Sequence, residues 1–226
     1  MKIMTARLIS YSKPPEELYV GTDIQELIAY TARVSNPSNQ DNTETSERLL
    51  RYLIREKHWS PFEMVSACLE VTTTRDIARQ LLRHRSFSFQ EFSQRYADPT
   101  QDLNFVMRQA RLQDTKNRQN SIELSDYHEH VDLQLEWYKQ QAEVTNAAKK
   151  SYQWAIENGI AKEQARAVLP EGIMESRLYV NGTIRSWIHY IELRSGHGTQ
   201  KEHIELARAC SAALEPIFPM IKEFCH

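Results

Sequence analysis

The sequence is poor in cysteine and glycine and has no long apolar run, and each shortage excludes a class of protein. Its 226 residues contain 3 cysteines, without a C-x-x-C pair, which argues against a disulfide framework or a structural zinc site. The 6 glycines form neither G-x-G-x-x-G nor G-x-x-x-x-G-K-S/T, so a bound nucleotide would be held by side chains. No stretch approaches the ~18 apolar residues that cross a bilayer, and the start MKIMTARLIS lacks a signal-peptide core. We therefore expect a cytoplasmic protein with no membrane partner.

The charge is nearly balanced, with 28 Lys and Arg residues against 30 Asp and Glu residues and a formal net charge of −2. Hydrophobic residues make up 41% of the chain, which is ordinary for a globular protein and unlike a disordered one. General nucleic-acid binding needs a net basic surface, so the balance argues against it. Because the chain has no repeat and no Gly-, Ser- or Pro-rich linker, we predict one domain over residues 1–226.

Hydrophobic spacing predicts an α+β fold with more helix than strand. Asn181-Gly182 reads as a turn after the last strand, and Asn158-Gly159 as the end of a long helix. Thr45 or Ser46 is expected to cap the second helix, and the polar segment 86–120 receives no assignment. The expected strands are 3–11, 62–74 and 173–180, and the expected helices are 23–32, 45–57, a helix from Arg75 onward, 125–158, 162–168, 183–194 and 200–214.

Arginine is concentrated in the segment RDIARQLLRHRSFSFQEFSQRY, residues 75–96. At ~100° per residue, Arg79, Gln80 and Arg83 lie opposite the apolar side of the expected helix. Arg85 would point into the apolar stripe, so either the helix stops near His84 or Arg85 is partly buried against an anion. Guanidinium groups match phosphate bidentately, which favours a phosphate-bearing ligand. A solvated face with surface ion pairs explains the cluster equally well.

A second polar cluster lies on the expected helix 183–194. Arg185, His189 and Glu192 stand at i, i+4 and i+7 on one face, whereas Arg194 projects from another side. An amphipathic helix with one solvated face accounts for the same pattern.

Two further groups carry no functional assignment. The basic residues Arg108, Arg111, Lys116 and Arg118 are interspersed with Gln, Asp and Asn, and we expect them to form a solvated loop. The histidine pairs 128/130 and 197/203 have neither helical spacing nor Cys or H-E-x-x-H support, so we expect no metal site.

The clusters combine into a recognisable pattern. Arg83-His84-Arg85, followed after seven residues by Ser93, resembles the RHR-x7-S signature of the flavin-dependent thymidylate synthases. The flanking sequences agree: SPFE at 60–63, ARQLLRHR before the signature, E-x-S-x-R-Y at 91–96, ARAVLP at 165–170 and LR at 193–194. The resemblance spans residues 58–194, most of the chain.

This resemblance implies an enzyme that converts dUMP to dTMP by reductive methylation. The carbon comes from 5,10-methylenetetrahydrofolate, NADPH reduces FAD, the flavin supplies the hydride, and tetrahydrofolate is released. The family is homotetrameric, with active sites between subunits and a small, mainly antiparallel sheet packed by long helices. It uses no enzymic cysteine nucleophile, in agreement with the isolated cysteines of this sequence.

The resemblance also implies residue roles. Arg194 matches the catalytic arginine that faces the uracil ring and favours loss of its N3 proton. Family members often carry Asn at the position of His189, and Asn181-Gly182 looks like a small local insertion. The expected FAD contacts are Ser60, Arg83, His84, Arg85, Glu91, Arg185 and His189, and the expected dUMP contacts are Gln80, Arg83, Glu91, Ser93, Arg95, Arg166 and Arg194.

Two other functions fit parts of the sequence. A nucleotide-binding protein that has lost catalysis would keep the same pocket, although the complete signature argues against it. A DNA- or RNA-binding module would use the basic residues between 75 and 118 and would show salt-dependent binding.

Overall fold

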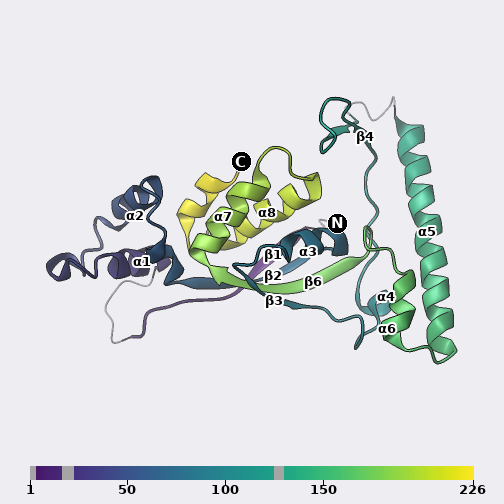
Figure 1. Cartoon of the computed structure of the whole chain (residues 1–226), viewed down its shortest axis with the longest axis horizontal. Coiled ribbons are helices and arrows are strands. Elements are labelled where there is room, and N and C mark those ends of the chain that lie inside the picture. The colour runs from purple at the N-terminus through teal and green to yellow at the C-terminus, as the bar shows by residue number, and fades with distance from the viewer. Residues whose placement is uncertain (1–3, 17–22, 125–129) are drawn as a thin grey trace.

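A four-stranded antiparallel sheet, in the order β1-β2-β6-β3, lies at the centre of the protein (Figure 1). The computed structural model describes residues 4–16, 23–124 and 130–226. The strands expected over 3–11, 62–74 and 173–180 are confirmed in their main parts, although residue 3 lies outside the described residues and residues 62–63 belong to a 3-10 turn. A fourth strand comes from the segment that had no assignment. The strands are β1 (Thr5–Tyr11), β2 (Ser66–Thr74), β6 (Glu175–Thr183) and β3 (Ser88–Glu91).

The two central strands, β2 and β6, set the frame for the helices. They pair over their whole length, from Ser66 opposite Thr183 to Thr74 opposite Glu175. Buried and exposed positions alternate along β6, as the two-residue period of a strand requires. The residues of β6 that face the interior are Ser176, Leu178, Val180 and Gly182.

Three helices connect to these strands and share their core. The helix α3 (Arg75–Leu81) follows β2 directly, α7 (Ile184–Ser195) follows β6, and α8 (Lys201–Leu214) packs against α7 and β1. Trp187 of α7 is fully buried, and its Nε1 donates a hydrogen bond to the Ala67 carbonyl oxygen of β2 at 3.0 Å. The helices expected over 183–194 and 200–214 are therefore confirmed.

The remaining helices lie at the two ends of the molecule (Figure 1). At one end are α1 (Ile24–Ala32) and α2 (Ser46–Arg55); at the other are α4 (Pro99–Asp102), the long α5 (Val131–Glu157) and α6 (Lys162–Ala165). A hairpin of β4 (Arg111–Gln113) and β5 (Ser121–Glu123) and 3-10 turns at 37–39, 60–63, 166–168 and 219–224 complete the structure. The helix α5 ends before Asn158-Gly159 as expected, whereas the first residues expected in it, 125–129, lie outside the described residues.

The turn expected at Asn181-Gly182 is wrong, because both residues lie inside β6. Asn181 pairs with Cys68 on one side and Ser88 on the other, and Gly182 pairs with Ala67. A Cβ atom at Gly182 would lie 2.2 Å from the ring of Phe87. The glycine therefore lets an aromatic ring pack directly on the strand backbone instead of forming a turn.

Two helix boundaries also differ from expectation. Thr45 precedes α2 but makes no capping hydrogen bond, because its hydroxyl oxygen accepts a hydrogen bond from Arg33 instead. The helix ends at Arg55 rather than Lys57. By contrast, the helix α3 ends at Leu81, so the alternative in which the helix stops near His84 is confirmed and Arg85 is exposed after the helix.

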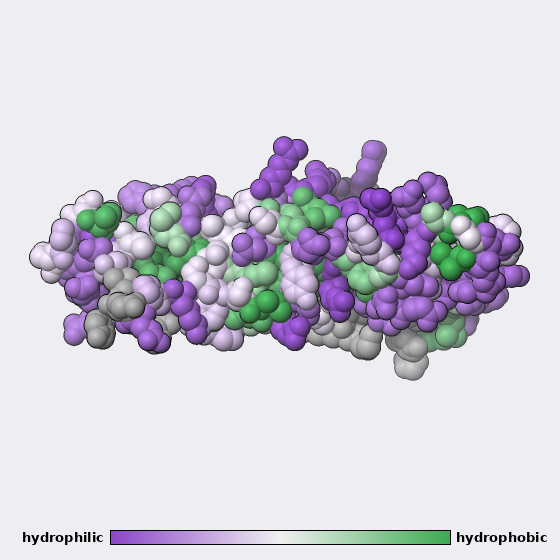
Figure 2. All heavy atoms as spheres, turned by 90° about the horizontal axis from the view of Figure 1, so that it is seen from below, coloured by the Kyte–Doolittle hydropathy of each residue, from purple (hydrophilic) through white to green (hydrophobic). Residues whose placement is uncertain are grey.

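The surface is polar with separate apolar patches. In the view from below, green patches are divided by purple residues (Figure 2). Within the described residues, none of the helices combines the length and apolar character needed to span a bilayer.

Replacing Gly182 should destabilise the sheet. Phe87 is 7% exposed and its ring packs against Trp187 at 4.6 Å between centroids, so it has no room to move away from a new methyl group. We expect Gly182→Ala to lower the free energy of unfolding by about 1–3 kcal/mol, as overpacking does. Gly172→Ala is the matched control, because a Cβ there meets nothing within 4 Å and should change stability by less than about 0.5 kcal/mol. Urea unfolding of both variants measures the difference; equal stabilities would contradict this packing.

Candidate functional site

The C-terminal ends of α3 and α7 bring two distant parts of the sequence together. Arg194 Nε donates a hydrogen bond to His84 Nε2 at 3.0 Å, although 110 residues separate them. The ring of His84 also packs edge-on against Tyr190, with 5.1 Å between centroids. The arginine for which the family resemblance implies a contact with the uracil ring therefore contacts the central histidine of the R-H-R signature.

Gln80 is held by two residues from the N-terminal end of α8. His203 Nδ1 lies 3.1 Å from Gln80 Oε1, and Gln80 Nε2 donates to Gln200 Oε1 at 3.1 Å. The chain of hydrogen bonds continues from Gln200 Nε2 to Glu202 at 2.9 Å and from Arg111 Nη2 to Glu202 at 2.8 Å. Both ends of the Gln80 amide are thus fixed, which sets its orientation.

Both histidines in this region are neutral at ordinary pH. Burial, with Arg194 and Arg83 nearby, lowers the pKa of His84 to about 4. Burial, with Arg194 and His84 nearby, lowers the pKa of His203 to about 3. His84 Nε2 can accept a hydrogen bond only when it carries no proton, so its neutral form carries the proton on Nδ1.

Glu91 lies at the end of β3 within a group of opposite charges. Ser176 Oγ donates to Glu91 Oε1 at 2.8 Å, and Arg79 Nη1 donates to Oε2 at 3.3 Å. Arg75, which is 7% exposed, has its Nη1 3.6 Å from Glu91 Oε1. Glu171 lies within ion-pair distance of both arginines. These contacts fix the position of the Glu91 carboxyl group at the sheet edge, with part of its surface accessible.

The loop after β3 carries the signature serine. The Arg95 backbone N–H donates to Ser93 Oγ at 3.3 Å, so the hydroxyl is oriented by its own loop. The Arg95 side chain is exposed and lies 3.3 Å from Glu163 of α6. Arg166 begins the 3-10 turn after α6.

Ser60, Arg185 and His189 form another group where α7 meets the 3-10 turn 60–63. Arg185 Nη1 donates to Glu63 Oε1 at 2.6 Å. The His189 ring packs edge-on against Trp59, with 4.6 Å between centroids. Burial, together with the charge of Arg185, lowers the pKa of His189 below its usual value.

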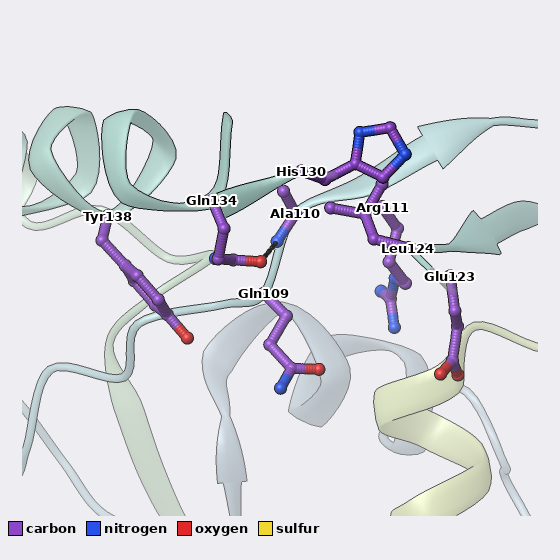
Figure 3. Close-up of a pocket in the computed structure, with 8 residues that line it drawn as sticks. All are labelled: Gln109, Ala110, Arg111, Glu123, Leu124, His130, Gln134 and Tyr138. Atoms are coloured by element: carbon purple, nitrogen blue, oxygen red, sulfur yellow. Dashed lines mark hydrogen bonds between the residues drawn. The ribbon is translucent and has the colours of Figure 1, made fainter. Parts of the chain in front are cut away.

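Among the described residues, no hydrogen bond or ion pair joins the Arg194, Glu91, Ser93 and Ser60 groups to one another, and Arg83 and Arg85 are exposed without ion pairs. A cavity between the hairpin β4–β5 and the start of α5 is lined by none of the predicted residues (Figure 3). There, Gln134 Oε1 accepts a hydrogen bond from the Ala110 backbone N–H at 2.9 Å.

Sequence reasoning missed several residues that shape the site, and the expectation of a solvated basic loop is partly wrong. Arg108 Nη2 donates to Asp76 and Thr74, and Arg111 pairs with Glu202, so both arginines are structural.

Gln200, Glu202 and His203 had no assigned role in the sequence analysis, although they contact or orient Gln80. Their only signal in the sequence was a run of polar residues at the start of a helix, which is the usual composition of a solvated helix end.

The chain is similar to proteins of one enzyme family. Residues 17–220 match the family model described as thymidylate synthase complementing protein. A probable flavin-dependent thymidylate synthase of Paramecium bursaria Chlorella virus 1 is 51% identical over 218 residues, 96% of this chain and 97% of that protein. A flavin-dependent thymidylate synthase of Synechocystis sp. is 48% identical over 221 residues, with 96% and 97% covered. The crystal structure of the UMP/dUMP methylase PolB from Streptomyces cacaoi bound with 5-Br dUMP has a TM-score of 0.76 and 26% identity, covering 98% of this chain and 93% of that chain.

The neutral histidines should make folding stability fall in mild acid. Because their folded-state pKa values are lowered to about 4 and about 3, the unfolded chain binds more protons than the folded chain below pH ~6.5. The free energy of unfolding should therefore decrease as the pH falls from about 7 to about 5, a range mostly above carboxyl titration. His84→Gln and His203→Gln should each make this slope shallower, measured by urea unfolding at several pH values. The exposed His197, as His197→Gln, is the control; a slope that all three variants share with the parent chain would refute the assignment.

Proposed function

We propose that this chain catalyses the reductive methylation of dUMP to dTMP. The premise is that it belongs to the thymidylate synthase complementing protein family, that is, the flavin-dependent thymidylate synthases. In this proposal 5,10-methylenetetrahydrofolate gives the carbon, and NADPH and FAD give the reducing equivalents. The observation that carries the proposal is the Arg194–His84 contact, which unites the two strongest motifs of the sequence at one place.

The residues present fit a flavin dinucleotide. Arg83 and Arg85 are exposed guanidinium groups that form no ion pair with described residues, and they suit the anionic pyrophosphate of FAD. Ser60, Arg185 and His189 lie where α7 contacts the 3-10 turn 60–63, and they offer hydroxyl, guanidinium and imidazole groups to the same cofactor. When bound, the flavin supplies the hydride chemistry that no side chain of the protein can perform.

The dUMP-binding residues divide between the phosphate and the base. Ser93, Arg95 and Arg166 offer a hydroxyl and two guanidinium groups to the phosphate. Gln80, with its amide fixed by His203 and Gln200, offers donor and acceptor atoms near the pyrimidine. Glu91, held by Ser176 and two arginines, borders both ligands.

Arg194 is placed to stabilise negative charge on the uracil ring. Its Nε donates a hydrogen bond to His84, and no other hydrogen bond to a described residue engages its guanidinium, so the terminal nitrogens are available to a ligand. A guanidinium is charged at every working pH, so it lowers the free energy of an N3-deprotonated ring without giving up a proton. The neutral His84 leaves this positive charge uncompensated.

No cysteine nucleophile takes part in the proposed reaction. Burial raises the pKa of the Cys68 and Cys210 thiols, so both are protonated at neutral pH. The thiolate is the nucleophilic form of cysteine, and neither residue has a base beside it among the described hydrogen bonds.

We also propose that the enzyme is a homotetramer whose active sites lie between subunits. The exposure of Arg83 and Arg85 and the separation of the predicted groups support completion of the site by a second chain. The helix α5 adds an exposed apolar face on one side, which suits a contact with another copy. Its residues are Leu133, Trp137, Val144 and Trp154.

The direct test is the visible spectrum of the purified protein, followed by an assay with all substrates. We expect flavin absorbance, NADPH-dependent dTMP formation from dUMP and 5,10-methylenetetrahydrofolate, and a particle of four chains by light scattering. A colourless protein that takes up no added FAD would contradict the proposal.

Replacing Arg194 should separate methylation from flavin binding. Arg194→Ala should keep flavin absorbance and anaerobic flavin reduction by NADPH, because its terminal nitrogens face the pyrimidine. Tritium release from labelled dUMP should fall by on the order of 10²-fold or more, as for removal of one preorganised charge. Arg194→Lys should recover little, since an ammonium is a point charge on a flexible stem.

The control for Arg194 is Arg7→Ala, which removes an exposed arginine of β1 paired with Glu70. This variant should retain both activities. If Arg194→Ala instead loses FAD while tritium release per bound flavin stays normal, Arg194 is a flavin residue and the proposed role is wrong.

A further inference from the structure

An arginine-lined cavity lies between α1 and α2, apart from the residues assigned to flavin or dUMP. Its volume is about 770 Å³, enough for part of a nucleotide. Four arginines line it, and none of its lining residues is acidic. In a chain with more acidic than basic residues, this local excess of positive charge is unusual. The four arginines are Arg33, Arg48, Arg51 and Arg55.

Two of these arginines are already neutralised by carboxylates outside the cavity wall. Arg51 Nη1 lies 2.7 Å from Glu223 and its Nη2 lies 2.8 Å from Glu47. Arg55 Nε lies 2.8 Å from Glu56. Their positive charges therefore explain part of the lining without any ligand.

Arg33 and Arg48 have no such counter-ion among the described residues. Arg33 is only 7% exposed, and its guanidinium donates to two neutral oxygens, the Asn42 carbonyl and the Thr45 hydroxyl. A buried charge is unfavourable unless an opposite charge compensates it. Arg48 lies in the first turn of α2, where the helix dipole disfavours a cation. Helix stability therefore does not explain why an arginine stands at position 48. The buried positive charge of Arg33 has no carboxylate beside it to compensate it.

The other residues that line the cavity suit a phosphate group joined to a nucleotide base. The N-terminal end of α2 opens at Thr45 on the cavity wall and adds its positive dipole end to the two guanidinium groups. Tyr52, 46% exposed, lines the same cavity and offers aromatic surface. Two uncompensated positive charges suit a dianion.

We propose that this cavity binds the phosphate of a nucleotide, and that in the proposed reaction the nucleotide is NADPH, recognised by its 2′-phosphate. The identity of the nucleotide rests on the proposed function. The phosphate site itself does not. Arg33 and Arg48 hold the phosphate, and Tyr52 contacts the adenine. NADH, which lacks this phosphate, makes none of the arginine contacts.

Direct binding tests the site without turnover. Adenosine 2′,5′-bisphosphate and adenosine 5′-phosphate are titrated into the full-length protein by calorimetry. The bisphosphate should bind more tightly, and Arg48→Gln should weaken its binding by about tenfold, as expected for loss of one charge-assisted contact to phosphate. Arg7→Gln removes the same charge from β1, far from this cavity in sequence and paired with Glu70, and should leave binding unchanged.

Kinetics then identify the nucleotide. Arg48→Gln should raise the KM for NADPH by about tenfold while the KM for NADH and the kcat at saturating NADPH stay within about twofold. Because Arg48 is exposed and its neighbours keep their ion pairs, the variant should fold; circular dichroism and flavin absorbance check this.

Each outcome decides between the proposals. If the bisphosphate binds Arg48-dependently but no dTMP forms with NADPH, the phosphate site stands and the proposed function fails. If dTMP forms while Arg48→Gln changes neither bisphosphate binding nor the KM for NADPH, the phosphate site is wrong and the proposed function stands. If a polyglutamylated folate, added as a third titrant, shows the only Arg48-dependent binding, the occupant is a carboxylate chain and the NADPH assignment is overturned.

Discussion

The hydrogen bond from Arg194 to a neutral His84 is the constraint on which the candidate site depends. It exists only while His84 Nε2 is unprotonated, and burial beside two arginines lowers the pKa of His84 to about 4. A protonated His84 would place two positive charges against each other and turn an acceptor into a donor. Because the histidine is neutral, it adds no positive charge beside the guanidinium of Arg194. One contact therefore fixes the position of the arginine and depends on the charge state of the histidine.

The central strand pair explains why these two residues meet. Because β2 and β6 are antiparallel and pair end to end, α3 starts from one end of the pair and α7 from the other. Each strand has 9 residues and spans about 30 Å. The helices have 7 and 12 residues and span about 10 and 18 Å. Helices of these lengths, each returning from its own end of the strand pair, must finish close together, so their C-terminal residues meet above the sheet. Changing either length by a turn would separate His84 from Arg194.

The helices and central strands could be predicted from the sequence because the spacing of apolar residues indicates which face is buried. The motifs could be located because each one is continuous in the chain. Contacts between distant segments have no local sequence pattern and could not be predicted. Gly182 looks like a turn residue until Phe87 is placed against it, and Gln80 has no visible partner until α8 brings Gln200 and His203 beside it. A local pattern shows that a residue is polar or small, but only the fold shows which neighbour requires it.

The arginines show how counter-ions separate structural charges from ligand-binding ones. Arg75, Arg79 and Arg111 each lie within ion-pair distance of a glutamate, and their charges are balanced inside the chain. Arg33, Arg83 and Arg194 make no ion pair with a described carboxylate, although two of them are at least partly buried. An unbalanced guanidinium withdrawn from water carries an unfavourable desolvation energy, which a bound anion offsets. In a chain whose total charge is near zero, a partly buried arginine without a carboxylate partner, such as Arg33 or Arg194, is therefore suited to receive negative charge from outside the chain.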